Sequence, residues 1–434
     1  MKPASREVKA AAEELNCASA SDRSIVVSDQ FLSILVAQLS GDDVEVSSNA
    51  AEVITICCRR LGSPMSNRSI QAICTAWQEV RGNISIDRSR NSTISVRCAS
   101  AIVDIAVLED ANMEIAISSK AMNQLLSMVT DASDPLLAMS SLDLVEQLAV
   151  SMPMHGNRAR WLFSAPLLNP LLQMAGGGCP DEDPDPILGG SALRLLSALC
   201  RLGQRDSTLF GLGGSELLTG FYNALQKFDG SGELERLAFI DAVSSFASAS
   251  PDALELVLND PIVREGWLSL SVAQPKLKSV VMKSVANVLD PPAEIDASGD
   301  LTITSNIPTN AMALKLFSSV GLVNDRDATE LILSLAKSTI EVLRFGAYSL
   351  LEAVARRGTG SQMLLSHGGF FEFLIHMEGE TVKEGKEAKF KIIEAVMKSE
   401  ARGLLADNIV TKLEKILDQG PFYIQTEKLD VMTE

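Results

Sequence analysis

The most regular feature of this chain is a helical pattern of apolar residues that recurs along most of its length. In the segment from Gly232 to Ala247, GELERLAFIDAVSSFA, the apolar side chains follow one another at spacings of three and four residues. Such spacing places them on one wide face of a helix, and the small alanines let a neighbouring helix approach closely. We therefore expect this helix to be covered by neighbours on more than one side.

Similar apolar segments occur before and after it. They are Asn49 to Cys58, Val96 to Leu108, Leu137 to Val150, Ser191 to Cys200, Lys278 to Leu289 and Phe345 to Ala355. Most follow one another at intervals of roughly 40 to 50 residues, with one longer gap, and this is the period of armadillo and HEAT solenoids. Because a repeat array grows by stacking, we interpret residues 1–434 as a single helical-repeat solenoid. The predicted fold is all-α, an armadillo/HEAT-like right-handed α-solenoid.

Polar insertions interrupt this pattern near residues 80–93, 175–187 and 290–310, and we expect a loop at each. The second contains AGGGCPDEDPDP, whose glycines, prolines and like charges do not form a helix. Near the start, residues 1–24 are expected to form an opening helix, and Ser28 or Asp29 to cap the next one. At the other end, residues 402–424 are expected to cap the last repeat and residues 425–434 to form a flexible tail.

Composition and charge narrow the class of partner. Apolar residues make up 46% of the chain but aromatic residues only 5%, and no alternating strand pattern is evident, so an almost wholly helical protein is expected. The formal charge of −17 argues against nonspecific binding to nucleic acid or to an anionic membrane, and favours a basic or mixed-charge protein partner. No apolar window reaches the roughly 18 residues of a membrane span. We expect a soluble monomer in the cytoplasm, with the nucleus left open as a second location.

Residues with the chemistry of an active site are scarce. The seven cysteines form no CxxC pair and are expected to be core thiols. Asp181, Asp183 and Asp185 resemble the first ligands of a calcium loop, but Pro186 and Ala192 stand where such a loop needs Gly and Glu. Three histidines leave little for a zinc site or a nucleophile and its base. We therefore expect no enzyme, no metal and no cofactor.

Polar residues that interrupt the apolar face of the recurring helices are the first candidates for partner binding. In an armadillo unit, these positions of the third helix point into the groove. They are Glu52, Asp104, Asp143, Gln147, Arg194, Asp241, Lys283 and Asn287. The alternative is that each belongs to a solvated face. Together they predict a groove that is more acidic in its N-terminal part and attracts a positively charged partner.

An acidic groove also leaves open an armadillo-type adaptor or cargo receptor for basic peptides. Import receptors of that type sandwich lysine stems between the indoles of a ladder of Trp and Asn residues. This chain lacks that ladder, so a peptide receptor is the second choice.

The C-terminal part carries a resemblance to a known family. Helix Phe345 to Ala355 is followed by SQMLLSHGGFFEFLIHMEGE from Ser361, by KEGKEAKFKIIEAVMKS from Lys383 and by GPFYI from Gly420. Together, these segments resemble the 26S proteasome non-ATPase regulatory subunit 5 family. The resemblance is sharpest from Phe345 onward, and upstream it consists of the repeat architecture.

This resemblance implies a helical-repeat chaperone for assembly of the proteasome regulatory-particle base. Members of the family bind the C-terminal region of an AAA ATPase subunit, hold it with a second ATPase and the large non-ATPase scaffold subunit, and leave before the proteasome is complete. Which ATPase is bound stays open. Because the resemblance is strongest near the C-terminus, an alternative binding surface is formed by Arg344, Lys386, Lys389, Phe422 and Tyr423. We expect the two aromatic residues to fold back over the last helices, with a direct partner contact as the alternative.

Overall fold

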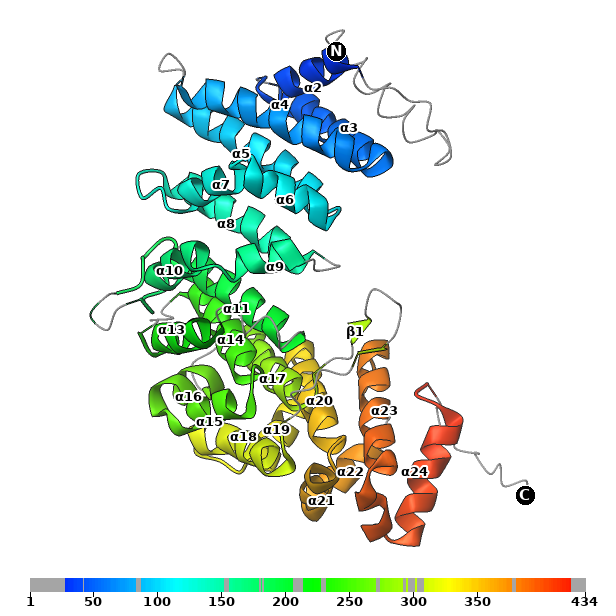
Figure 1. Cartoon of the computed structure of the whole chain (residues 1–434). Helices are drawn as coiled ribbons and strands as arrows, with labels where there is room; N and C mark the ends of the chain where they lie inside the picture. The colour runs from blue at the N-terminus through cyan, green and yellow to red at the C-terminus, as the bar shows by residue number, and fades with distance from the viewer. Residues whose placement is uncertain are drawn as a thin grey trace. The chain divides into compact units, whose positions relative to one another are not determined.

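The computed structural model describes residues 28–422, apart from 42, 83–86, 152–155, 179–180, 182, 206–213, 228–231, 271–273, 292–293, 296–300, 303–307 and 377–379. Its contacts divide the chain into two compact units, Met1–Ala224 (unit 1) and Leu225–Glu434 (unit 2), and each is described by itself. Both consist of stacked helices, as Figure 1 shows, so the predicted all-α armadillo/HEAT-like class is confirmed. The continuity of one solenoid over residues 1–434 stays a prediction.

Unit 1 is built from helices of 7 to 20 residues. Its helices are α2 (Asp29–Leu39), α3 (Val44–Leu61), α4 (Ser63–Gly82), α5 (Arg88–Ala106), α6 (Asp110–Ser118), α7 (Ala121–Val129), α8 (Pro135–Val150), α9 (Gly156–Leu162), α10 (Ala165–Met174), α11 (Gly189–Arg205) and α13 (Gly214–Lys227), which contains the boundary. The helices α3, α5, α8 and α11 pack each against the next and form the long-helix row of unit 1. A second row contains α4, α6 and α9.

Unit 2 repeats this arrangement. Its helices are α14 (Glu233–Ala247), α15 (Pro251–Asn259), α16 (Pro261–Leu268), α17 (Pro275–Leu289), α18 (Asn310–Val323), α19 (Ala328–Ala336), α20 (Glu341–Ala355), α21 (Gly358–Ser366), α22 (Gly368–Ile375), α23 (Lys383–Lys398), the 3-10 helix η2 (Glu400–Leu404) and α24 (Asp407–Gln419). The long-helix row of unit 2 is α14, α17, α20 and α23. A Cβ atom at Gly346 of α20 would lie 2.8 Å from the Ser279 Cα of α17, so the close packing of these helices requires glycine there.

The recurring apolar segments of the sequence are the helices of these two rows. In α14, Ile240, Val243 and Phe246 are buried, and so are Ser244 and Ser245 on the adjoining face. This confirms that the helix is covered on more than one side. Leu234 departs from the prediction, because its side chain is 78% exposed in the first turn, where the neighbouring side chains are also exposed.

The predicted helix boundaries hold at some positions and need correction at others. Ser28 caps α2, because its Oγ accepts a hydrogen bond from the Phe31 amide at 3.2 Å. The predicted loop at 80–93 is shorter: α4 runs to Gly82 and α5 begins at Arg88, with the Asp87 carboxylate accepting from the Ser89 amide. The first turns of α5 face solvent and are therefore polar, so their sequence was taken for part of the loop.

The insertion at 290–310 also differs from a plain loop. It contains the two-residue strands β1 (Glu294–Ile295) and β2 (Leu301–Thr302), which pair antiparallel with Glu294 opposite Thr302. The expected opening helix at 1–24 and the tail at 425–434 lie outside the described residues. None of the helices in the described part combines the length and the apolar character that a membrane span requires.

Candidate protein-binding groove

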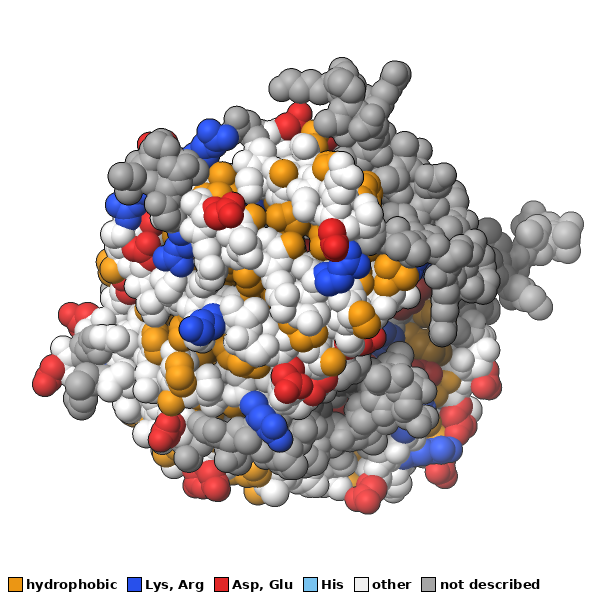
Figure 2. Space-filling model, turned by 45° about the horizontal axis from the view of Figure 1, so that its top comes forward, with side chains coloured by type: hydrophobic (Ala, Val, Ile, Leu, Met, Phe, Trp, Pro, Cys, Tyr) orange, Lys and Arg blue, Asp and Glu red, His pale blue; other side chains and the backbone are white. Residues whose placement is uncertain are grey.

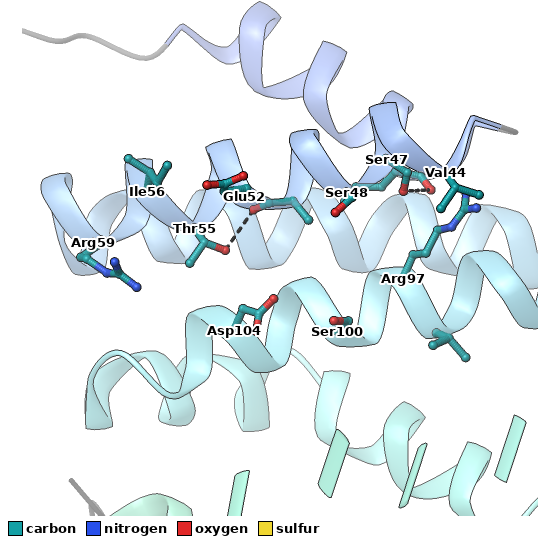
Figure 3. Close-up of a pocket in the computed structure, with 13 residues that line it drawn as sticks. Val44, Ser47, Ser48, Glu52, Thr55, Ile56, Arg59, Arg97, Ser100 and Asp104 are labelled. Carbon is teal, nitrogen blue, oxygen red and sulfur yellow. Dashed lines mark hydrogen bonds between the residues drawn. The ribbon is translucent and has the colours of Figure 1, made fainter. Parts of the chain in front are cut away.

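Two adjoining pockets open along the long-helix row of unit 1. The first, of about 560 Å³, lies between α3 and α5 (Figure 3), and the second, of about 880 Å³, is lined by residues at the start of α5 and α8. Val44, Val96 and Arg97 line both pockets, so the two form one continuous groove, called here the α3–α5–α8 groove. Its size is within the range of clefts that hold small ligands or a few side chains of a partner.

Two of the predicted binding residues lie on opposite sides of the first pocket. Glu52 comes from α3 and is exposed, whereas Asp104 comes from α5 and is half-buried (Figure 3). Gln147 of α8 donates a hydrogen bond from Nε2 to Asp104 Oδ1 at 2.9 Å. Burial raises the pKa of Asp104, and the hydrogen bond from Gln147 offsets this only in part. The structure therefore brings together three of the predicted residues.

Arginine side chains also line this pocket. Arg97 donates from Nη1 to the Gly41 carbonyl oxygen at 2.6 Å, and so is tied to the turn before α3. Arg59 lies toward the opposite end of α3 (Figure 3). Over the face drawn in Figure 2, basic and acidic side chains are interspersed, with apolar side chains exposed between them. The lining of the groove is mixed in charge: the first pocket has Glu52 and Asp104 with Arg59 and Arg97, and the second has Asp87 and Asp134 with Arg88 and Arg97.

Sequence reasoning missed the apolar residues of the groove. Val44, at the start of α3, is 67% exposed, and Leu136, in the first turn of α8, is 76% exposed. Both line the second pocket. A signal was present, since each follows closely on an aspartate that caps its helix, Asp43 or Asp134.

The other predicted groove residues lie on the long-helix rows but outside these pockets. Asp143 of α8 and Arg194 of α11 are exposed in unit 1, and Arg194 donates from Nη2 to Ser191 Oγ at 3.1 Å. In unit 2, Asp241 of α14 and both Lys283 and Asn287 of α17 are exposed. A groove that runs through both units stays a prediction.

In unit 2, the alternative site residue Arg344 belongs to a buried cluster. It donates from Nε and Nη2 to the two oxygens of Glu380, at 2.9 and 3.1 Å, and Glu380 is only 2% exposed. The Tyr348 hydroxyl donates to Glu380 Oε2 at 2.9 Å, and the Val382 amide to Oε1 at 3.0 Å. Burial acts to raise the pKa of Glu380, but these hydrogen bonds outweigh it and lower the pKa. The cluster joins α20 to the start of α23.

Lys389 was predicted to belong to the same alternative binding surface, but it is buried. Its side chain is 4% exposed, with Nζ donating to the His376 carbonyl oxygen at 2.5 Å and lying 4.5 Å from the centre of the Phe373 ring. A buried ammonium group cannot contact a partner, so Lys389 packs within unit 2, whereas Arg344 is paired with Glu380 and its side chain is 15% exposed. A Cβ at Gly385 would lie 2.4 Å from Glu380 Cδ, which shows how tightly α23 begins against this cluster.

Two other residues of the alternative site remain accessible. Lys386 is half-buried, and Phe422 is 50% exposed, with Lys383 Nζ lying 5.8 Å from its ring centre. Lys383, in the first turn of α23, thus lies near the Phe422 ring, and the fold-back of the two aromatic residues stays a prediction. Tyr423 lies outside the described residues.

The burial of Lys389 predicts a measurable pH dependence. Burial lowers the pKa of Lys389 to about 8, whereas a lysine in an unfolded chain titrates near 10.4. Between these values the unfolded chain holds a proton that the folded chain has released, so stability rises with pH in that window. We expect urea denaturation of the wild type to show a rise on the order of 1–2 kcal/mol from pH 7.5 to pH 9.5 that Lys389→Met lacks. The control Lys391→Met, on the exposed face of α23, keeps the rise. Equal pH slopes for wild type and Lys389→Met would show that Lys389 titrates normally.

The cysteines show no sign of reactivity. Five of them, Cys57, Cys58, Cys74, Cys98 and Cys200, are buried free thiols. Burial raises the pKa of Cys57 to about 11 and that of Cys98 to about 12. The prediction of core thiols is confirmed for these five, whereas Cys17 and Cys179 lie outside the described residues. In the described part of the chain, no group of three His, Cys, Asp or Glu residues could hold a metal ion.

Comparisons with known proteins agree with the C-terminal resemblance. Residues 222–434 match the model of a family described as proteasome non-ATPase 26S subunit. The match covers unit 2 and supports a proteasome-related family for this part of the chain. No curated protein matches the sequence.

Among solved structures, the chain is similar to an engineered protein from the Northeast Structural Genomics Consortium. The identity is 14% and the TM-score 0.52, over 96% of this chain and 92% of that one. A designed armadillo repeat protein in complex with the peptide (KR)4 has 14% identity and a TM-score of 0.44, over 63% of this chain and 98% of that one. The first likeness shows a common fold alone.

Proposed function

We propose that this protein is a non-enzymatic chaperone for assembly of the proteasome regulatory-particle base. It binds the C-terminal region of an AAA ATPase subunit, together with the large non-ATPase scaffold subunit, and dissociates before the mature proteasome forms. The observation that carries the proposal is the match of residues 222–434 to proteasome non-ATPase subunits, which supports a proteasome-associated role. The segments quoted from Phe345 onward favour the regulatory subunit 5 family within that class.

The physical properties of the chain suit this role. Stacked helical repeats offer a wide surface, and holding a partner on such a surface blocks its docking elsewhere without any bond-making chemistry. We further propose that it acts as a monomer in the cytoplasm, with the nucleus as a second location.

Direct binding to purified ATPase domains tests the proposal. The full chain is expected to bind the isolated C-terminal domain of at least one proteasomal ATPase subunit, in the absence of nucleotide, with a dissociation constant below about 1 μM, as for a specific protein interface. Failure to bind any of these domains would overturn the proposal.

Charge reversals then show which unit carries the contact. Glu52→Lys with Asp143→Lys changes two exposed residues of unit 1, and Lys386→Glu changes a half-buried residue of unit 2. If the long-helix row of unit 1 contacts the ATPase, the double variant binds more slowly and its association rate depends less on salt. If the contact lies in unit 2, only Lys386→Glu weakens binding.

A further inference from the structure

The last helix of unit 2 leaves most of its apolar face uncovered. Its apolar residues lie along one face of α24 and are Ile409, Val410, Leu413, Ile416 and Leu417. Only Leu413 is buried, although α24 packs against α22 and α23 at the edge of the unit (Figure 1). The other four residues are half-buried and are called here the α24 strip. In a stack of helices such a face is covered by a neighbouring element, so the strip indicates a further occupant.

The two sides of the α24 strip differ in charge. On one side, Ile409 and Ile416 adjoin Lys412 at spacings of three and four residues. On the opposite side, Glu414 accepts a hydrogen bond from the guanidinium of Arg402 in η2 at 2.6 Å. Lys412 is exposed and, among the described residues, forms no ion pair. The side with Lys412 therefore suits a segment that is both apolar and acidic.

The path of the chain after α24 brings a segment of this kind close to the strip. Gly420 has a φ of 79°, and its amide donates to the Ile416 carbonyl oxygen at 3.0 Å, which ends the helix. Phe422 then lies near the first turn of α23, with its ring centre 5.8 Å from Lys383 Nζ. Residues 423–434 follow, outside the described residues. An extended segment of this length reaches about 40 Å, twice the length of α24, which is about 20 Å. The segment is therefore long enough to return along the whole strip.

The composition of this segment matches the α24 strip, and its tether favours it over other occupants. Residues 423–434, YIQTEKLDVMTE, contain aliphatic side chains at Leu429 and Val431, and three acidic residues against one lysine. A tethered segment has an effective concentration in the millimolar range, so a small contact is enough to hold it. A second copy of the chain would need a contact of about 800 Å² on each partner, whereas the face of one helix of this length measures about 20 by 10 Å.

We propose that residues 423–434 bind back on the α24 strip, with aliphatic side chains over Ile409 and Ile416 and an acidic side chain beside Lys412. This replaces the flexible tail expected from the sequence for residues 425–434. The bound segment is a cover that any partner of the strip has to displace. The inference concerns the free protein, so it does not depend on the proposed chaperone role.

Hydrogen exchange measured by mass spectrometry tests this proposal on the full chain. The reference is a variant that ends at Phe422 and therefore lacks the covering segment. The amides of α24 are expected to exchange about tenfold more slowly in the full chain than in this variant, because the cover opposes the local opening of the helix. Equal exchange rates of α24 in the two proteins overturn the proposal.

Matched variants of the full-length chain identify the side chains that form the cover. Leu429→Ser with Val431→Ser is expected to speed the exchange of α24 about tenfold, as the shortened chain does. The control Gln425→Ser with Thr433→Ser changes two polar residues of the same segment and is expected to leave the exchange unchanged. Equal exchange in the two double variants overturns the assignment of the aliphatic side chains. Protection of α24 that is lost on dilution, together with a dimer in sedimentation, would show that a second copy occupies the strip and also overturns the proposal.

Discussion

Phe246→Asp is expected to abolish the folded state of unit 2. The Phe246 side chain is 2% exposed in α14, a helix of the long-helix row that packs against α17. Removing a buried phenylalanine costs about 3–5 kcal/mol, and burying an unpaired carboxylate adds several more. This sum is comparable to the whole stability of a typical domain, about 5–15 kcal/mol. The expected result is insoluble protein, or soluble protein without a cooperative thermal transition.

Leu234→Asp provides the matched control for this variant. It makes the same kind of replacement on the same helix, but the Leu234 side chain is 78% exposed in the first turn. Its effect is expected to stay within about 0.5 kcal/mol. Similar stability of the two variants would contradict the burial assigned to α14 and the packing of the row.

Glu380→Gln is expected to destabilise unit 2 by about 3 kcal/mol. Removing one partner of a buried ion pair costs about 3–5 kcal/mol. We expect the lower end of this range because glutamine keeps part of the hydrogen bonding. The change leaves the Arg344 guanidinium, whose side chain is 15% exposed, without its carboxylate. Since the pKa of Glu380 is lowered in the folded state, the stability it contributes is present above the unfolded pKa near 4.3 and is lost as pH falls below it. The difference between wild type and variant should therefore shrink in acid.

Urea denaturation of Glu380→Gln beside Glu372→Gln measures this effect. Glu372 is exposed on α22, so its replacement is expected to change stability by less than about 0.5 kcal/mol. If the two variants are equally stable, the cluster around Glu380 makes no net contribution. Replacing Arg344 and Glu380 together with methionine is expected to restore only part of the loss. The ion pair is then removed whole, but the buried Lys389 and the Tyr348 hydroxyl still lose Glu380.

The repeat architecture could be predicted because it depends on local periodicity. The apolar face of a segment such as Phe345 to Ala355 is visible in a few turns of sequence, and its recurrence along the chain indicates stacking. The boundaries were less certain where polar residues begin a helix, as at Arg88. There, the solvated first turns of α5 have the same composition as a loop.

The contacts within and between helices were harder to predict. Glu380 lies far from Arg344 in sequence, and only the path of the chain between α22 and α23 brings it back against α20. The same path of the chain buries the Lys389 side chain, which was predicted to lie on the surface. In contrast, Glu52 and Asp104 both line the first pocket, because equivalent positions of successive repeats face the same side.

Affinity purification of the tagged full chain from cells tests the proposed chaperone role most directly. The proteins that co-purify are identified and quantified by mass spectrometry. The proposal predicts stoichiometric recovery of proteasomal ATPase subunits with the large non-ATPase scaffold subunit, and no subunits of the proteolytic core. Recovery of complete proteasomes would show that the protein is a resident subunit and not a chaperone. Recovery of proteins with exposed basic segments, without any ATPase subunit, would contradict the chaperone role altogether.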